Sequence, residues 1–169
     1  MRLRFVKISA TGNDFAVFDN RQGYLDPGRH RAWLSWLCQR RIAVGADGVI
    51  LVQASEAADF AYVHINADGS IAEMCGNGSR AVAFFAHQEG IASSPMRFEI
   101  GGRIYTAWVE GRSVTTQFVQ PFPPRLELGV ASEPFLREGG FVDTGVPHYV
   151  LFVESVEGID VVGLGRTYR

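Results

Sequence analysis

Short β-prone runs bounded by glycine, aspartate and asparagine dominate the chain. Apolar side chains in these runs alternate with polar ones or form brief continuous stretches, which is typical of strands with one or both faces buried. Two runs flank Glu110-Gly111-Arg112 and predict a pair of antiparallel strands. The predicted strands are Arg2–Ile8, Phe15–Phe18, Val49–Val52, Phe60–Ile65, Arg103–Val109, Ser113–Val119 and Tyr149–Val153.

Two other segments have the spacing of helices. Asp26-Pro27 combines a capping residue with a proline suited to a first turn, and Trp33, Trp36 and Leu37 follow at helical spacing. The second segment, Ser79–His87, is apolar on nearly every side. A helix of that kind is usually buried all round, so we expect it at the centre of the fold.

Together the elements predict an α/β (α+β) protein in which a buried helix is enclosed by short strands. A length of 169 residues predicts a single domain. The run Gln120–Pro124 contains three prolines and predicts a crossing or an exposed loop.

Composition narrows the classes of partner. The chain is 47% hydrophobic and 20% charged, with a formal net charge of -2 and no basic stripe, so nucleic acid is not an expected partner. No apolar stretch approaches the roughly 20 residues that span a bilayer, and the residues from Met1 on lack the long apolar segment expected of a signal peptide. With only Cys38 and Cys75, we expect a cytoplasmic protein with reduced thiols and no membrane partner.

Candidate chemistry lies just before the predicted central helix, in Cys75-Gly76-Asn77-Gly78. Backbone N–H groups in the first turn of a helix have no intrahelical acceptor and carry partial positive charge, and glycines allow close approach of a ligand. Such a place binds a carboxylate and favours the thiolate form of a cysteine. A thiolate there suits proton removal from the carbon beside the carboxylate, while the N–H groups stabilise the enediolate charge.

Spacing alone leaves structural roles open for the cysteines. Glycine-flanked cysteines also occur in plain turns, so Cys75 could be structural. Cys38 lies in Trp36-Leu37-Cys38-Gln39 and is expected to be a small buried apolar residue.

Five motifs, in order along nearly the whole chain, resemble those of diaminopimelate epimerases. They are Lys7–Phe15, Arg41–Gly48, Asn66–Ser70, Cys75–Gly78 and Asp143–His148. The resemblance implies isomerisation of LL-diaminopimelate to the meso form in lysine and peptidoglycan biosynthesis, without pyridoxal phosphate or a metal. It also implies a mainly antiparallel sheet wrapped around the central helix, and a homodimeric full-length enzyme.

In that family two cysteines face the α-carbon from opposite sides, one removing a proton and the other returning one. Cys75 matches the first of these. Asn13 and Asn66 match side chains that bind substrate, whereas Gly76 and Asn77 match backbone donors to the substrate carboxylate.

His148 matches a histidine that tunes the two thiols. Taken without the resemblance, a histidine after a proline and before a strand is read as a hydrogen-bonded loop residue.

Three departures concern the substrate. Val146 replaces an asparagine often found before Pro-His, and Gly48 stands where some members have a substrate-binding glutamine. Met74 before Cys75 also occurs in the related proline racemases, whereas Asn77 is typical of the epimerases.

Length is the largest departure. Family members have a second, similar lobe that carries the other thiol, so we expect residues 1–169 to be one amino-terminal lobe with the carboxy-terminal lobe absent, and to be inactive alone. Two alternatives stay open: a racemase of another amino acid such as proline, and a lobe that only binds small carboxylates or a partner.

Overall fold

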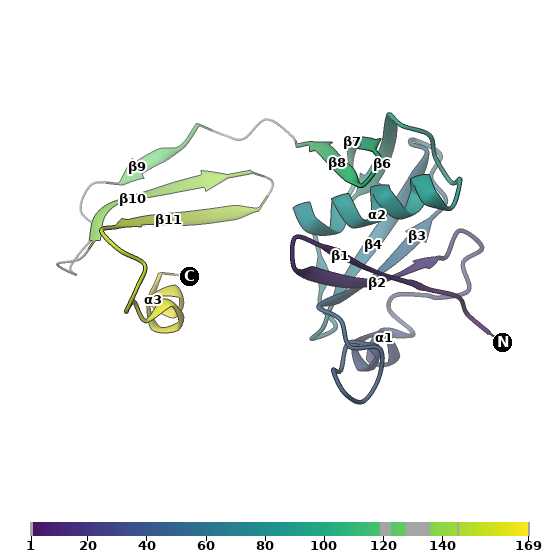
Figure 1. Cartoon of the computed structure of the whole chain (residues 1–169), viewed down its shortest axis with the longest axis horizontal. Coiled ribbons are helices and arrows are strands. Elements are labelled where there is room, and N and C mark those ends of the chain that lie inside the picture. Colours follow the sequence, from purple (N-terminus) through teal and green to yellow (C-terminus); the bar gives the residue numbers. More distant parts are fainter. Residues whose placement is uncertain (1, 119–122, 128–135, 145, 169) are drawn as a thin grey trace. The chain divides into compact units, whose positions relative to one another are not determined.

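Two compact units make up the chain. The computed structural model describes residues 2–118, 123–127, 136–144 and 146–168. The first unit is Met1–Gln117 and the second is Phe118–Arg169, and each has its own sheet (Figure 1). No helix in the described ranges is long and apolar enough to cross a membrane.

The first unit is built on one sheet of eight strands. Its strands are β1 (Val6–Ala10), β2 (Asn13–Asp19), β3 (Gly48–Gln53), β4 (Phe60–Asn66), β5 (Ile71–Ala72), β6 (Met96–Ile100), β7 (Arg103–Glu110) and β8 (Ser113–Gln117). They are ordered β1-β2-β3-β4-β6-β7-β8, with β5 paired to β4. Only the β2–β3 and β4–β6 pairings are parallel, so the sheet is mainly antiparallel, as the resemblance implied.

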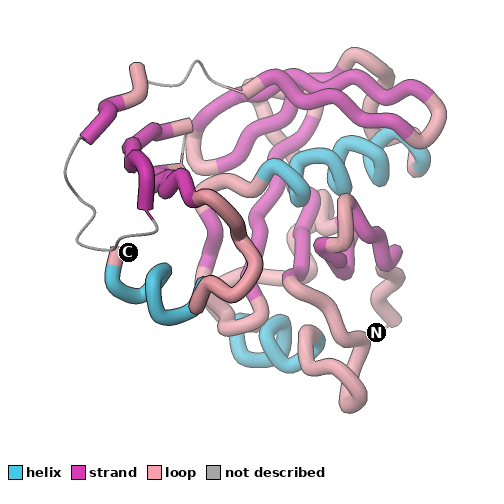
Figure 2. Tube along the Cα trace, turned by 60° about the vertical axis from the view of Figure 1, so that its left-hand side comes forward, coloured by secondary structure: helices cyan, strands magenta, loops and turns pink. Residues whose placement is uncertain are grey.

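Helix α2 (Gly76–Gln88) is the central element of this unit. It contacts β1, β2, β3, β7 and β8, which lie on more than one side of it (Figure 2). Its apolar side chains are buried on most of its circumference, as its sequence predicts. The one buried hydroxyl, that of Ser79, shares a 2.9 Å hydrogen bond with Tyr62, so the helix buries no unpaired polar group there.

The first predicted helix starts later than expected. Asp26 accepts hydrogen bonds from the backbone N–H groups of Arg29 and His30, which close a separate turn. Helix α1 (Arg31–Leu37) begins only afterwards. It buries Leu34 and Leu37, whereas Trp33 and Trp36 are 38% and 44% exposed, so the predicted start at Asp26-Pro27 is wrong.

Most predicted strands of the first unit are confirmed. The predicted hairpin is β7 paired with β8, with Glu110 opposite Ser113. Strand β6 was not predicted, although its side chains are buried at alternate positions from Met96 to Ile100. Val119 and most of Gln120–Pro124 lie outside the described residues.

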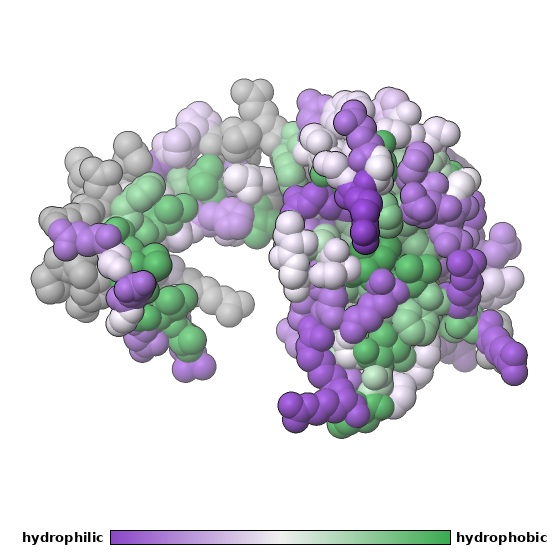
Figure 3. Space-filling model, in the orientation of Figure 1, coloured by the Kyte–Doolittle hydropathy of each residue, from purple (hydrophilic) through white to green (hydrophobic). Residues whose placement is uncertain are grey.

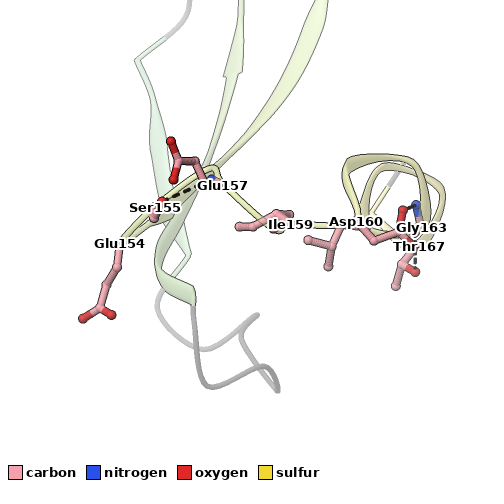
Figure 4. A pocket seen from close by; sticks show the side chains of 9 residues that line it. Glu154, Ser155, Glu157, Ile159, Asp160, Gly163 and Thr167 are labelled. Atoms are coloured by element: carbon pink, nitrogen blue, oxygen red, sulfur yellow. Dashed lines mark hydrogen bonds between the residues drawn. The ribbon is translucent and has the colours of Figure 1, made fainter.

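The second unit contains a three-stranded antiparallel sheet and one short helix. Its elements are β9 (Arg125–Glu127), β10 (Leu136–Asp143), β11 (Pro147–Val153) and α3 (Val161–Thr167), with the strands ordered β11-β10-β9. β11 confirms the strand predicted over Tyr149–Val153. Asp160 caps α3 by accepting from the N–H of Gly163 at 2.9 Å, beside an acidic cavity of about 540 Å³ that Glu154 and Glu157 also line (Figure 4).

Apolar burial differs sharply between the units. Every apolar side chain buried among the described residues lies between Phe15 and Val109. In the second unit, Phe152, Val156, Val161 and Val162 are all more than half exposed. The hydrophobic core thus belongs to the first unit.

Candidate active site

Three strand ends of the first unit meet where the predicted site residues lie. Asn13 begins β2 and Asn66 ends β4, and between them Gly48 begins β3 opposite both Phe15 and Asn66. The loop residue Asp47 ties the ends together: its N–H donates to the Asp14 carbonyl at 2.8 Å and its carbonyl accepts from Ala67 at 3.2 Å. Asn13 and Asn66 therefore lie at the same edge of the sheet.

Cys75 is the residue immediately before α2, as the sequence predicts. It has extended backbone geometry and caps the helix, with its Sγ accepting from the N–H of Gly78 at 3.4 Å. The first intrahelical bond runs from Ser79 N–H to the Cys75 carbonyl at 2.8 Å. The N–H groups of Gly76 and Asn77 precede that bond, so they have no acceptor within the helix.

Asn13 is the second contact of the sulfur. Its Oδ1 lies 3.9 Å from Cys75 Sγ, and the thiol is the donor. At its other end, Nδ2 donates to Asp47 Oδ2 at 2.9 Å. A series of hydrogen bonds thus links the Cys75 sulfur, through the Asn13 carboxamide, to the Asp47 carboxylate.

Asp47 belongs to a cluster of four charged side chains. Arg40 donates to Asp14 at 2.7 Å and to Asp47 at 2.9 Å, and Lys7 lies 3.1 Å from Asp14. The Arg40 guanidinium, aided by Lys7, holds the pKa of Asp14 well below its usual range. Asp14 is therefore ionised at neutral pH, and both carboxylates are held in place by ion pairs with Arg40.

The side chains of Asn66 and Asn77 are already hydrogen-bonded within the unit. Asn66 Nδ2 donates to Ser70 Oγ at 3.0 Å, inside the turn that follows β4. Asn77 Oδ1 accepts from Thr11 Oγ1 at 2.8 Å and from the Arg80 guanidinium. These bonds hold the Asn77 carboxamide by its oxygen, and the backbone N–H of Asn77 stays without an acceptor in the helix.

His64 is buried beneath this edge. It is 3% exposed, and neither ring nitrogen has a hydrogen-bond partner among the described residues. Burial lowers the pKa of His64 to about 4, so the imidazole is neutral at pH 7. A Cβ at Gly48 would lie 2.6 Å from His64 Nε2, so this imidazole fills the space in which a side chain at position 48 would start.

His148 lies in the second unit, on β11 opposite Val142, and its side chain is exposed. Gly145, within the same motif, is outside the described residues. The role of His148 at the thiols stays a prediction.

A cavity of the first unit lies along β1 and α2. It has a volume of about 510 Å³ and is lined by β1, by Arg80, Ala81 and Phe84 of α2, and by the start of β8. Figure 3 shows apolar side chains gathered on the face where α2 and β1 lie, bordered by hydrophilic ones. Cys75 is not among its lining residues. The described side chains include no group of three or more His, Cys, Asp or Glu placed to hold a metal ion.

Comparison with known proteins assigns the chain to a family. The family model for diaminopimelate epimerase matches residues 5–117. The chain belongs to the diaminopimelate epimerase family. It is 39% identical to the diaminopimelate epimerase of Aquifex aeolicus over 99% of this chain and 40% identical to that of Chlorobaculum tepidum over 96%.

This member of the family spans 63% of the Aquifex aeolicus relative and 62% of the Chlorobaculum tepidum relative. Solved structures share its fold at low identity. A Bacillus anthracis phenazine biosynthesis protein of the PhzF family is 15% identical, with a TM-score of 0.66 over 90% of this chain and 55% of that one. A hydroxyproline epimerase from Agrobacterium vitis is 16% identical, with a TM-score of 0.64 over 96% of this chain and 53% of that one.

Two residues of the site were not predicted. Asp47 lies inside the Arg41–Gly48 motif, but a carboxylate in a loop gives no sign of which amide it will bind. His64 sits in an otherwise apolar run, Phe60–Ile65, whose pattern predicts burial and says nothing of a nearby glycine on another strand.

Proposed function

We propose that this chain supplies one of the two thiols of an epimerase that interconverts LL- and meso-diaminopimelate. The family membership supports this reaction type. The observation that carries the proposal is the position of Cys75 Sγ before α2, next to two backbone N–H groups that have no acceptor in the helix. In this proposal the sulfur and the site for the substrate carboxylate are neighbours.

The proposed reaction removes a proton from one face of the substrate α-carbon and returns a proton to the opposite face. The substrate carboxylate binds the N–H groups of Gly76 and Asn77, and the side chains of Asn13 and Asn66 bind other polar groups of the substrate. The Cys75 thiolate takes the α-proton, and the C–H electron pair moves into the carboxylate as an enediolate. N–H donors at that oxygen stabilise the developing charge. A second thiol then protonates the carbon from the opposite face, which leaves Cys75 protonated and the second sulfur anionic.

Cys38 is a poor candidate for the second thiol. It is 4% exposed, its Sγ donates to the Leu34 carbonyl at 3.7 Å, and burial raises its pKa. We therefore propose that residues 1–169 form an amino-terminal lobe and that a second lobe supplies the other thiol and completes the site.

Several further features are proposed on the family alone. His148 tunes the thiols, and the full-length enzyme is a cytoplasmic homodimer that uses no cofactor and binds neither nucleic acid nor membranes.

An alkylating analogue of diaminopimelate tests the proposal. When the carboxy-terminal part of the Aquifex aeolicus relative is supplied, we expect the analogue to label Cys75 and to spare Cys38, which mass spectrometry of peptides resolves. A matched alkylating agent without the two carboxylates controls for general reactivity. Labelling at equal rates by both reagents would contradict a diaminopimelate site.

Two other functions remain as proposals with their own observations. Met74 beside Cys75 favours a racemase of proline or a hydroxyproline, and the Agrobacterium vitis structure holds trans-4-hydroxy-L-proline. A substrate panel in deuterated water separates the two enzymes, because exchange with a cyclic imino acid alone would exclude diaminopimelate.

A lobe that only binds carboxylates is the third possibility, motivated by the burial of Cys38, the only other cysteine of the sequence. Calorimetry with Cys75→Ser tests it: unchanged affinity, with no α-proton exchange by the wild-type chain and its second lobe, would favour binding over catalysis.

A further inference from the structure

We propose that Asp47 is a positioning residue that determines which end of the Asn13 carboxamide faces the Cys75 sulfur. The inference rests on the proposed function, because it assigns that sulfur a task in proton transfer. It concerns a residue outside the predicted set, and the contacts that carry it all lie within the first unit.

The chemistry of the carboxylate fixes the orientation of the amide. An ionised carboxylate only accepts hydrogen bonds, so Asn13 must turn its NH2 group toward Asp47. Asp47 Oδ2 accepts from Asn13 Nδ2 at 2.9 Å and from the Asp14 N–H at 3.0 Å, while Oδ1 accepts from Arg40 at 2.9 Å. These three donors fix the position of the Asp47 carboxylate, which in turn fixes the orientation of the Asn13 carboxamide. Asn13 Oδ1 is left to face Sγ at 3.9 Å.

Opposite influences consequently act on the sulfur. The Gly78 N–H donates to Sγ at 3.4 Å, and a donor interacts more strongly with a sulfur anion than with a thiol. The Asn13 oxygen accepts from the thiol, so it stabilises the protonated form and repels the anion. In a reaction with two thiols, each sulfur must take a proton in one direction and give it back in the other. In this proposal the carbonyl oriented by Asp47 accepts the S–H of Cys75 after the sulfur has removed a proton.

Neighbouring titratable groups are uncharged, ion-paired or, in the case of Arg80, hydrogen-bonded to neutral side chains. His64, beyond Gly78, is neutral because burial lowers its pKa, and Tyr62 is neutral because burial raises its pKa. On α2, the Arg80 guanidinium bonds to Asn77, and in the cluster behind Asn13, Arg40 and Lys7 neutralise Asp14 and Asp47. Asn13 is the residue that links Asp47 to the sulfur by hydrogen bonds.

Alkylation of Cys75 by iodoacetamide, measured across pH on the 169-residue chain without substrate, tests the orientation. Asn13→Ala should raise the rate at pH 7 about threefold or more and move the alkylation profile to lower pH, since one hydrogen bond to the thiol is lost. Cys38 in the same sample reports any general loosening. A slower or unchanged Cys75 would mean that the carbonyl does not face the sulfur, and would overturn the proposal.

A double-mutant cycle tests the part played by Asp47. Asp47→Ala should raise the Cys75 rate by a similar factor, and should add little in the Asn13→Ala background. Asp14→Ala removes a carboxylate from the same cluster that makes no bond to the Asn13 side chain, and so measures the effect of charge alone. Asp47→Ser, whose hydroxyl can donate as well as accept, gives a second reading if circular dichroism shows that Asp47→Ala is unfolded.

The positioning role would be overturned if Asp47→Ala raised the Cys75 alkylation rate by the same factor in the wild-type and Asn13→Ala backgrounds. It would also be overturned if Asp14→Ala raised this rate as much as Asp47→Ala, because either result would show a through-space charge effect. Because the assay involves neither substrate nor turnover, such a failure leaves the epimerase proposal standing, and absence of epimerisation would not alter the alkylation result.

Discussion

At the scale of single residues, His64 is the group whose protonation most directly opposes folding. Its pKa is about 4 in the folded chain against an ordinary value of 6.5, because the buried imidazole is kept neutral. Above pH 6.5 both folded and unfolded forms are neutral and the group contributes no pH dependence. Between pH 6.5 and about 4 the unfolded chain binds a proton that the folded chain does not, so stability falls as the pH falls.

We predict that acidification from pH 7.5 to 4.5 lowers the free energy of unfolding by an amount of order 3 kcal/mol through this residue. His64→Leu should lose much less over the same range, and should be at least as stable at pH 7.5 because it removes an unpartnered buried polar group. Urea titrations at the two pH values measure both effects.

Asp14 acts in a different window. Its pKa is lowered, mainly by Arg40, so the stability that it contributes is present above the ordinary carboxyl value and is lost only as the pH falls through the folded value. If wild type and His64→Leu lost the same free energy of unfolding between pH 7.5 and 4.5, the loss could not be assigned to His64.

At the scale of elements, the pairing of β3 with β4 depends on a glycine. Gly48 lies opposite Asn66, and a Cβ there would stand 2.6 Å from His64 Nε2 and 2.9 Å from the Ile65 carbonyl. Both distances are shorter than real contacts of a Cβ, so the absence of a side chain at position 48 is a steric requirement of this sheet. A glutamine at this position, as the resemblance suggested for some family members, would therefore not fit beside His64.

Gly48→Ala should therefore destabilise the chain by about 1–3 kcal/mol, the usual effect of overpacking a core. In a His64→Ala background part of that loss should return, because the imidazole clash is gone while the backbone clash remains. Denaturation midpoints of the four proteins measure the coupling. Equal losses in both backgrounds would rule out the imidazole as the obstacle.

How far sequence reasoning reaches also differs between elements. The run Ala81–Ala86 is apolar on all sides, so its burial against the sheet follows from its composition. Cys75, just before this helix, is its N-terminal capping residue. The start of α1 could not be predicted in the same way, because Asp26 and Pro27 suit a single turn as well as a helix. Trp33 and Trp36 also have the spacing of a buried helix face, although both are exposed. Contacts such as Asn13 with Asp47 depend on side-chain geometry across strands, which no local pattern encodes.

At the scale of the whole molecule, the two units differ in what holds them together. The buried apolar side chains of the described ranges all lie in the first unit, and so do Trp33, Trp36 and Trp108. Tryptophan fluorescence therefore reports the unfolding of that unit alone.

We predict that residues 1–117 fold without the rest, with a free energy of unfolding within about 0.5 kcal/mol of that of the 169-residue chain, since no core residue is removed. Residues 118–169 by themselves should show no cooperative transition by circular dichroism. A large loss of stability in residues 1–117 would show that the second unit contributes to the core.

The most direct test of the account is deuterium wash-in at the α-carbon of LL-diaminopimelate in deuterated water, with the carboxy-terminal part of the Aquifex aeolicus relative supplied. Wild-type chain should give meso product that carries deuterium at the inverted centre, whereas Cys75→Ala should give none and Cys38→Ala should match wild type. Inversion by the Cys75→Ala chain, or by residues 1–169 without a second lobe, would contradict proton transfer between this sulfur and a second thiol.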